Sequence, residues 1–408
     1  MIESIQAKLK EELKNRSIDA YIAYTPGNLF YTTGFSSPLK TIFWRMWGGD
    51  LAIIPANPAE ATLILSDFVA PAAPIATNVE DIRTYRTWVE NRELDIISAE
   101  QAQGTWLETP SRPAQFDITE VHQLLRNVLI ERGLTKSVIG TDLRYMHKET
   151  YDQLVENNPE CSFVDCTDLL YKLRSVKYPA EITSLRNAAL LFESGVTHSI
   201  NNLESDHSAQ IIKHQYLAGV ISHVLSDRSL GEYRSSFGFV SAGNGSQMAF
   251  GTQNYLKAND LVKFDCGAIL NGYASDCGRT FVCGKATRQQ KQMYGALMET
   301  HETIRSMMKP GIKLADIATT AEQQVRQSGF PNYTRGHFGH SIGLDDFVEE
   351  PPFIATNDKS VLVPGMVMCI ETPYYSKELG SIQIEDMVLI TESGHENFNS
   401  LSYDLVEV

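Results

Sequence analysis

The second half of the 408-residue chain contains two apolar segments that each carry a pair of carboxylates. The first segment is interrupted by Asn271-Gly272, a dipeptide that favours a two-residue hairpin turn. With this dipeptide at the turn, Asp265 faces Gly278 and Asp276 faces Gly267, so both carboxylates project from one side of the ribbon. Two acids this close repel one another unless a proton or a cation separates them, whereas a solvated surface pair needs neither.

The second segment repeats the arrangement further along the chain. A turn near Lys377–Gly380 places Glu371 opposite Glu385, and both acids lie in strongly apolar strands. An unpaired carboxylate is costly in such surroundings. One acidic hairpin can arise without any function, but two of them predict a cation site.

A glycine-rich segment between the hairpins, residues 335–345, contains His340. A histidine in such a segment is most often structural, but these glycines allow a close approach to a ligand. Four carboxylates and one imidazole are the ligands that two hard or borderline divalent ions need, and four negative charges balance two such ions. The predicted metal ligands are Asp265, Asp276, His340, Glu371 and Glu385.

This ligand set, in this order and with these flanking sequences, resembles that of the pita-bread metallopeptidases. The group contains Xaa-Pro dipeptidases, aminopeptidase P and methionine aminopeptidase, with the metal-free creatinases as relatives. The segments that carry the resemblance are Phe264–Gly267, Gly272–Asp276, Gly339–Leu344, Pro364–Glu371, Ile384–Ile390, Leu173–Lys177 and Gly27–Phe35. The resemblance spans most of the chain, whose two-domain length is similar to that of prolidase and creatinase.

The resemblance implies a dinuclear metal hydrolase that cleaves an amide bond, with proline or a proline-like group after that bond. Asp276 and Glu385 are expected to bridge the ions, Asp265 to complete one ion, and His340 with Glu371 to complete the other. Mn²⁺ is the first expectation, and Fe²⁺, Co²⁺ or Zn²⁺ also suit these ligands. His340 and Glu371 are the candidate catalytic residues, because the counterpart of Glu371 lies beside the reacting water and can transfer its proton.

Three positions depart from the prolidase pattern. The histidine that usually precedes the first ligand is missing from Gln247–Phe250, a second usual histidine is replaced by Phe347, and a usual arginine is replaced by Gln383. His337 is either a substitute donor or a structural residue. These departures leave two alternatives open: a hydrolase of another C–N bond, or a metal-assisted lyase that acts on a small zwitterion. A binding protein without turnover is a third, which the complete ligand set disfavours.

An aromatic cluster in the amino-terminal part, Phe43–Trp47, has two interpretations. It fits a domain core. By resemblance, it also fits an amino-terminal segment that reaches the active site of a partner in a homodimer, which makes Trp47 a candidate substrate contact.

The elements that must position these residues fall into two predicted domains, 1–170 and 171–408. The first is predicted as α/β, from a helix over 119–132 and short apolar strands, while residues 70–117 show little periodicity and are expected to be irregular. Its strands are expected at 19–24, 51–55 and 61–66.

The second domain is predicted as an α+β pita-bread domain that holds the catalytic site. Its helices are expected at 167–178, 180–203, 207–226 and 287–308. Its strands are expected at 236–242, 261–269, 273–283, 366–374 and 380–391.

The composition excludes some classes of binding partner. The chain has 50 acidic and 35 basic residues, a formal net charge of −15, which argues against a general nucleic-acid-binding protein. The first residues lack the pattern of a secretory signal, and no apolar run is long enough to span a membrane. The six cysteines form no paired motif, which is typical of a reduced, cytoplasmic protein. The expected partner is a small peptide or amide substrate, with no nucleic acid and no membrane.

Overall fold

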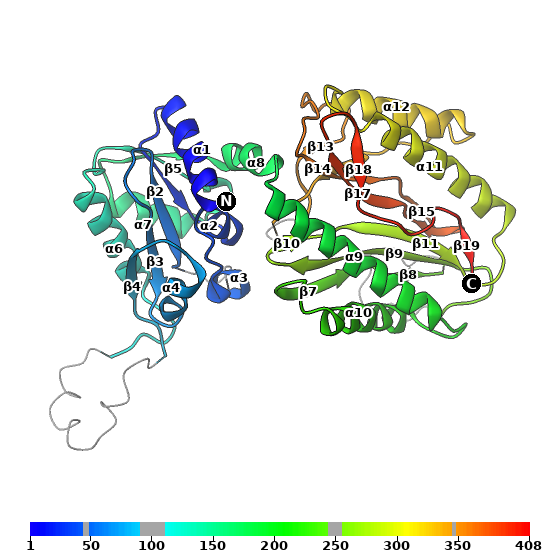
Figure 1. Ribbon diagram of the computed structural model, residues 1–408, viewed down its shortest axis with the longest axis horizontal. Coiled ribbons are helices and arrows are strands. Elements are labelled where there is room, and N and C mark those ends of the chain that lie inside the picture. The colour runs from blue at the N-terminus through cyan, green and yellow to red at the C-terminus, as the bar shows by residue number, and fades with distance from the viewer. Residues whose placement is uncertain (44–48, 90–110, 244–254, 345–347) are drawn as a thin grey trace, which may run out of the picture. The chain divides into compact units, whose positions relative to one another are not determined.

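The computed structural model describes residues 1–43, 49–89, 111–243, 255–344 and 348–408 (Figure 1). The chain divides into two compact units, Met1–Leu173 and Arg174–Val408. Three positions named from the sequence lie outside the described residues: Trp47, Phe347 and the segment 247–250.

The amino-terminal unit is built on a six-stranded mixed sheet with the strand order β4-β3-β2-β1-β5-β6. Every residue of β1, β2 and β3 is buried, which explains why these three strands are recognisable as short apolar runs and why their predicted positions are confirmed. The strands are β1 (Ala20–Ala23), β2 (Leu51–Pro55), β3 (Thr62–Ser66), β4 (Asp81–Tyr85), β5 (Val138–Thr141) and β6 (Ser162–Asp165).

Helices cover this sheet, and the predicted helix is present as α6 (Ile118–Glu131). Asp117 caps it by accepting a hydrogen bond from the Thr119 main-chain N–H, and Gly133 follows its end with a φ of 68°. The other helices are α1 (Ile2–Asn15), α2 (Pro26–Thr33), α3 (Pro38–Phe43), α4 (Ala73–Ala76) and α7 (Lys148–Asn157).

The expectation that 70–117 is irregular is wrong for its first part. Helical turns occupy Ala70–Ala72 and α4, and Asp81–Tyr85 forms β4, which pairs in parallel with β3. As the edge strand of the sheet, β4 keeps four of its five residues partly or fully exposed, so its sequence is polar and lacks the apolar alternation of a typical strand.

In the carboxy-terminal unit and the segment that enters it, the four predicted helices are confirmed as α8 (Thr167–Ser175), α9 (Pro179–Asn201), α10 (Ala209–Ser226) and α11 (Arg288–Met307). A reciprocal cap starts α11, since the Thr287 hydroxyl accepts from the Gln290 N–H while the Gln290 side chain accepts from the Thr287 N–H. A further helix that was not predicted, α12 (Leu314–Gln327), packs on α11.

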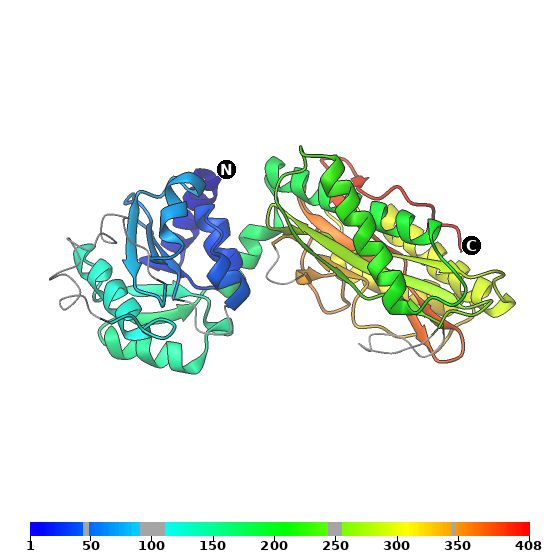
Figure 2. The same cartoon turned by 90° about the horizontal axis from the view of Figure 1, so that it is seen from below.

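The large sheet of this unit is almost entirely antiparallel, with the central order β10-β9-β11-β17-β14-β12-β13. Figures 1 and 2 show α9 and α10 alongside β7 and β9, with α11 and α12 alongside the half of the sheet that contains β14 and β17. The strands are β7 (Tyr233–Gly238), β8 (Ser241–Ala242), β9 (Leu261–Leu270), β10 (Tyr273–Ala274), β11 (Cys277–Val282), β12 (Gly339–Ser341), β13 (Glu350–Phe353), β14 (Val367–Glu371), β15 (Tyr374–Ser376), β16 (Gly380–Ile382), β17 (Glu385–Ile390), β18 (His395–Asn397) and β19 (Val406–Glu407).

The predicted strands are in place, but their predicted continuity is wrong at the acidic residues. A gap between β10 and β11 contains Ser275 and Asp276, and β14 ends at Glu371. At the first gap the Ser275 N–H still donates to the Ala268 carbonyl, while the Ser275 hydroxyl accepts from the Ala268 N–H and donates to the Ala188 carbonyl.

The core of this unit lies between the helices and one face of the sheet. Met368 and Ile370 of β14 and Val388 of β17 pack into one buried cluster with residues of α11 and α12. Because side chains alternate along a strand, the residues between them point to the opposite face. The helices therefore bury one face of the sheet, and the other face is available for a site.

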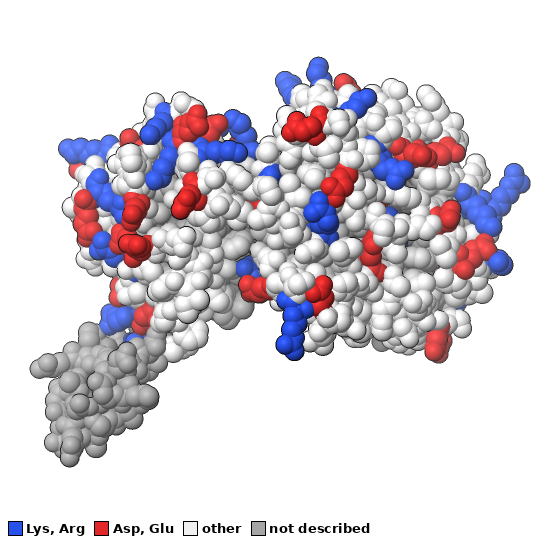
Figure 3. Space-filling view, in the orientation of Figure 1, with Lys and Arg blue, Asp and Glu red and all other residues white. Residues whose placement is uncertain are grey.

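No helix among the described residues is long and apolar enough to cross a membrane. On the face of the carboxy-terminal unit drawn in Figure 3, Lys and Arg side chains lie among Asp and Glu side chains.

Candidate metal centre

Three of the four predicted acidic ligands lie in one row across neighbouring strands. Asp265 of β9 pairs with Gly278 of β11, Gly278 pairs with Glu385 of β17, and Glu385 pairs with Glu371 of β14. The turn positions inferred from the sequence predicted the first and the last of these pairings, and both are confirmed. Residues in one cross-strand row project from the same face, so the three carboxylates share a face.

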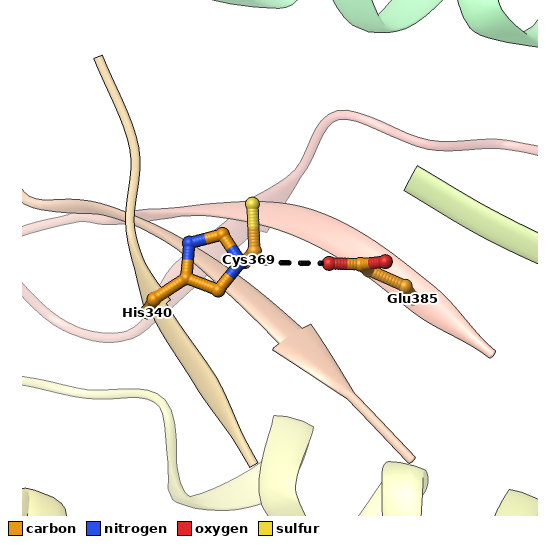
Figure 4. Close-up of side chains that lie close together, drawn as sticks. All are labelled: His340, Cys369 and Glu385. Atoms are coloured by element: carbon orange, nitrogen blue, oxygen red, sulfur yellow. Dashed lines mark ion pairs between the residues drawn. The ribbon is translucent and has the colours of Figure 1, made fainter. Parts of the chain in front are cut away.

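The other two predicted ligands join this row from adjacent positions. Asp276 lies two residues before Gly278, and His340 of β12 pairs with Cys369, two residues before Glu371. The Nε2 atom of His340 is 3.8 Å from Oε1 of Glu385 (Figure 4). The same atom is 3.9 Å from Oδ2 of Asp276. Oxygen atoms of Asp265, Asp276 and Glu385 lie within 4.8 Å of one another.

Two glycines make this close arrangement possible. A Cβ atom on Gly278 would lie 2.2 Å from Cγ of Gln383, so only glycine leaves space for that side chain across β11. Gly339 has a φ of 142°, and a Cβ there would lie 2.0 Å from the carbonyl oxygen of Cys369. Glycine is therefore required for β12 to bring His340 against β14.

The hydrogen bonding of His340 leaves one ring nitrogen free to bind a cation. Its Nδ1 is 3.0 Å from the main-chain oxygen of Ser341, and because a carbonyl oxygen only accepts, Nδ1 carries the proton. The unprotonated Nε2 then faces the carboxylates of Asp276 and Glu385. Burial also lowers the pKa of His340, which favours the neutral ring. Metal-bound histidines are typically oriented by such a hydrogen bond.

Asp276 and Glu385 are buried acids whose charges are not compensated. Burial, together with the neighbouring carboxylates, raises the pKa of each well above its ordinary value. Oδ1 of Asp276 has no hydrogen-bond partner among the described residues. Two buried carboxylates and an imidazole lone pair that converge on one position fit a divalent cation, so the donor set suits the metal that the sequence predicts.

Glu371 differs from these two acids because basic groups surround it. Arg335 Nη2 is 2.6 Å from Glu371 Oε2, and His337 Nδ1 is 3.2 Å from Oε1. Burial acts to raise the pKa of Glu371, but Arg335 and the two histidines His337 and His340 outweigh it and lower that pKa to about 2. Glu371 therefore stays ionised without a metal.

Asp265 also has a basic partner. The ammonium group of Lys263 donates to Oδ2 of Asp265 at 2.9 Å, and the Lys263 side chain is fully buried. Lys263 and Asp265 are separated by one residue in β9, so they share the face that carries the site.

Three residues of this centre were not identified from the sequence: Lys263, Arg335 and Cys369. Lys263 could have been found from the sequence because it lies two residues before Asp265 and so shares its face of the strand. Cys369 could have been found in the same way, because it lies two residues before Glu371. The Cys369 thiol lies near His340 and Glu385 (Figure 4) and donates to the main-chain oxygen of Asp276 at 3.5 Å. Burial raises the pKa of Cys369, which keeps the thiol protonated.

Of the predicted substrate contacts, two lie beside the acids. The Nε2 atom of Gln383 donates to Glu385 at 2.8 Å and to Glu371 at 3.1 Å, so this residue joins the two acids of the second hairpin. His337 contacts Glu371 and keeps 26% of its side chain exposed, which leaves it accessible from outside. The other two, Trp47 and Phe347, lie outside the described residues.

Comparison with known proteins agrees with this fold and identifies a family. Residues 183–392, just over half of the chain, match the family model of metallopeptidase family M24, and residues 6–176 match the creatinase/prolidase N-terminal domain. The Xaa-Pro dipeptidase of Pyrococcus furiosus is 25% identical over 402 residues, 98% of each chain. A putative dipeptidase of Bacillus subtilis is 28% identical over 68% of this chain and 76% of its own length.

Solved structures show the same fold over the whole chain. The Xaa-Pro dipeptidase from Bacillus anthracis aligns with a TM-score of 0.80 at 19% identity and covers 100% of both chains. The prolidase from Pyrococcus horikoshii aligns with a TM-score of 0.78 at 20% identity, over 99% of this chain and 100% of its own. With the resemblance found in the sequence thus confirmed, the chain belongs to metallopeptidase family M24, as a metal-dependent hydrolase with a creatinase/prolidase N-terminal domain ahead of its catalytic domain.

Proposed function

We propose that this protein hydrolyses the amide bond before proline, or before a proline-like group, in a small peptide. The observation that carries the proposal is the convergence of Asp276, Glu385 and the Nε2 lone pair of His340, three buried donors without a compensating charge. The names of the relatives, Xaa-Pro dipeptidase and prolidase, support the choice of substrate.

The proposed metal centre takes up two divalent ions, with Mn²⁺ the first choice. Asp265, Asp276, His340, Glu371 and Glu385 would hold these ions. When bound, such ions polarise the scissile carbonyl and lower the pKa of a water molecule. These ligands also suit Fe²⁺, Co²⁺ and Zn²⁺.

Glu371 is the proposed proton carrier. Its carboxylate is held by contacts with Arg335, His337 and Gln383, and its lowered pKa keeps it ionised at neutral pH. An ionised carboxylate in a fixed position accepts a proton from the attacking water and delivers it to the leaving nitrogen. Gln383 orients this carboxylate relative to Glu385.

Two groups are available to contact the substrate. His337 and Arg335 keep 26% and 19% of their side chains exposed, and each contacts one oxygen of the Glu371 carboxylate. Both are donors, so this side of the site suits a carbonyl or a carboxylate of the substrate. Phe347 and Trp47 remain proposed contacts on sequence grounds, Trp47 from the partner in a homodimer. The proposed location is the cytoplasm.

A substrate panel tests this function. The Mn²⁺-loaded protein is incubated with Gly-Pro and Ala-Pro, longer Xaa-Pro peptides, other dipeptides and non-peptide amides, with Glu371→Gln as the inactive control. Because Phe347 offers no donor where a histidine is usual, we expect simple Xaa-Pro dipeptides to turn over about 10²-fold more slowly than a site with that donor allows. The variant Phe347→His should raise this activity.

One alternative has support of its own. With Gln383 and Phe347 where prolidases usually carry charged or donor groups, the pocket suits a less polar substrate group, as in a non-peptide C–N hydrolase or a lyase for a small zwitterion. Rapid cleavage of Gly-Pro by the unaltered protein would exclude this alternative. Turnover of non-peptide amides without any peptide cleavage would instead contradict the proposed peptidase.

A further inference from the structure

One buried thiol at the centre has no role in the proposed function. Cys369 lies in β14, two residues before Glu371, so its side chain shares the face of the sheet that carries the site. It pairs with His340 of the neighbouring strand β12. Its Sγ atom, a ring nitrogen of His340 and a carboxylate oxygen of Glu385 lie within 4.8 Å of one another (Figure 4). Sulfur, nitrogen and oxygen atoms that can bind a metal therefore converge at one position.

The surroundings of this thiol are not those of a residue that only fills space. A buried cysteine in a core behaves as a small apolar side chain, but Cys369 faces an imidazole and a carboxylate. Its hydrogen bond to the main-chain oxygen of Asp276, at 3.5 Å, is of a weak kind. In the same centre, Oδ1 of Asp276 is buried and has no hydrogen-bond partner among the described residues. The centre therefore contains donor atoms that the chain leaves for a ligand.

We propose that Cys369 is a further ligand of the metal centre, used by borderline and soft divalent ions such as Zn²⁺, Co²⁺ and Cd²⁺ and left unused by Mn²⁺. Thiolate sulfur is a soft donor, whereas carboxylate oxygens suit Mn²⁺. When a softer ion binds, a sulfur–metal bond forms and the S–H bond breaks, with the proton released to the solvent. With Mn²⁺ the thiol keeps its proton and its hydrogen bond to Asp276. This inference rests on the proposed metal centre and adds to it a donor that distinguishes classes of ion.

The contribution of the sulfur is measured by a change in metal preference. A preference for Zn²⁺ over Mn²⁺ is not diagnostic by itself, because divalent ions follow that order at most sites. Cys369→Ser keeps a side chain of similar shape that can donate to the Asp276 carbonyl, but it removes the soft donor. We expect this variant to weaken Zn²⁺ binding at least about tenfold, the smallest loss usual for a group that supports a metal site. The affinity for Mn²⁺ should be unchanged, whereas a purely structural role of the thiol would change both affinities.

Spectroscopy of the full chain tests the ligand directly. The protein is stripped with EDTA and loaded with Co²⁺, because a thiolate bound to Co²⁺ gives an intense charge-transfer band in the near ultraviolet. We expect the band in the unaltered protein and its loss in Cys369→Ser at equal bound Co²⁺. The matched control is Cys277→Ser, which should keep the band, since it removes another fully buried thiol that hydrogen-bonds with Asn399. X-ray absorption of the Zn²⁺-loaded protein should show a zinc–sulfur distance of about 2.3 Å.

The spectra of the unaltered protein decide the matter even when Cys369→Ser does not fold. Bound Co²⁺ without the band, or bound Zn²⁺ with only nitrogen and oxygen neighbours, would overturn the inference while leaving the proposed function in place. A ratio of Zn²⁺ to Mn²⁺ affinity that is the same in Cys369→Ser as in the unaltered protein, measured by competition calorimetry, would also overturn it. Binding of none of these ions would refute the proposed metal centre as well.

Discussion

Glu385 and Asp386 are neighbours in β17, both fully buried, yet their carboxylates are in opposite situations. Asp386 points to the helix-covered face, where Arg279 contacts it at 2.7 Å, His301 of α11 at 3.0 Å and Asn397 at 3.1 Å. Burial acts to raise the pKa of Asp386, but these partners, led by Arg279, lower it far below its ordinary value.

Glu385 points to the other face and accepts one hydrogen bond from Gln383, while Asp276 and His340 face it without a cation. Its pKa is raised by burial and by Asp276. A buried acid whose partners come from the chain stabilises the fold, whereas one whose partners are missing marks a place for a ligand. In β17, Asp386 on the helix-covered face therefore has a structural role, and Glu385 on the other face has a functional one.

The strongest test of this division removes an uncompensated acid. Glu385→Gln and Asp276→Asn each replace a proposed metal ligand by a neutral amide of the same shape. We expect each to lose bound metal and to reduce kcat/KM by about 10³-fold or more. Circular dichroism should be unchanged, and the metal-free protein should lose no stability, because the repulsion between the two acids is also removed. Metal counting and peptide turnover measure the effect, and full activity in either variant would show that the residue binds no metal.

The converse substitution removes Asp386, the acid on the helix-covered face of β17. Asp386→Asn leaves the buried guanidinium of Arg279 without a counter-charge, so we expect the free energy of unfolding to fall by about 3–5 kcal/mol. Urea denaturation of the metal-free protein measures this loss, with Glu385→Gln as the matched control in the same strand. Equal stability of the two variants would remove the distinction between the faces.

The smallest expected effect concerns how the stability of the metal-free protein depends on pH. Because the folded pKa of Asp276 and of Glu385 is raised, their contribution to stability is present at low pH and lost as pH rises above the ordinary carboxyl range. Asp386 has a lowered folded pKa, so its contribution is present at neutral pH and lost in acid.

In the metal-free protein, we therefore expect Glu385→Gln to reduce the loss of stability that accompanies a rise in pH from about 5 to about 8. The reduction should be about 1.4 kcal/mol for every tenfold difference between the acid dissociation constants of Glu385 in the folded and unfolded chain. Metal binding should also release protons and tighten as pH rises. Urea denaturation in EDTA and calorimetry in buffers of different ionisation enthalpy measure the two effects. An unchanged pH profile in Glu385→Gln would contradict the raised pKa.

The sequence by itself determined much of the site. The Asn271-Gly272 turn fixes the register of the first hairpin, and alternation then sets Asp265 and Asp276 on one face. The same local rules place Lys263 beside Asp265, because residues two apart in a strand share a face. Contacts of this kind follow from chain geometry over a few residues.

Only the tertiary structure decided which acids have their negative charge balanced by a basic side chain. Arg335 reaches Glu371 from a segment before β12, and Asp386 gathers Arg279, His301 and Asn397 from β11, α11 and β18. Such partners are distant along the chain, and no local periodicity reports on them. The four carboxylates could be counted from the sequence, but the charge that they leave for a metal depends on side chains that only the packing of distant strands and helices brings together.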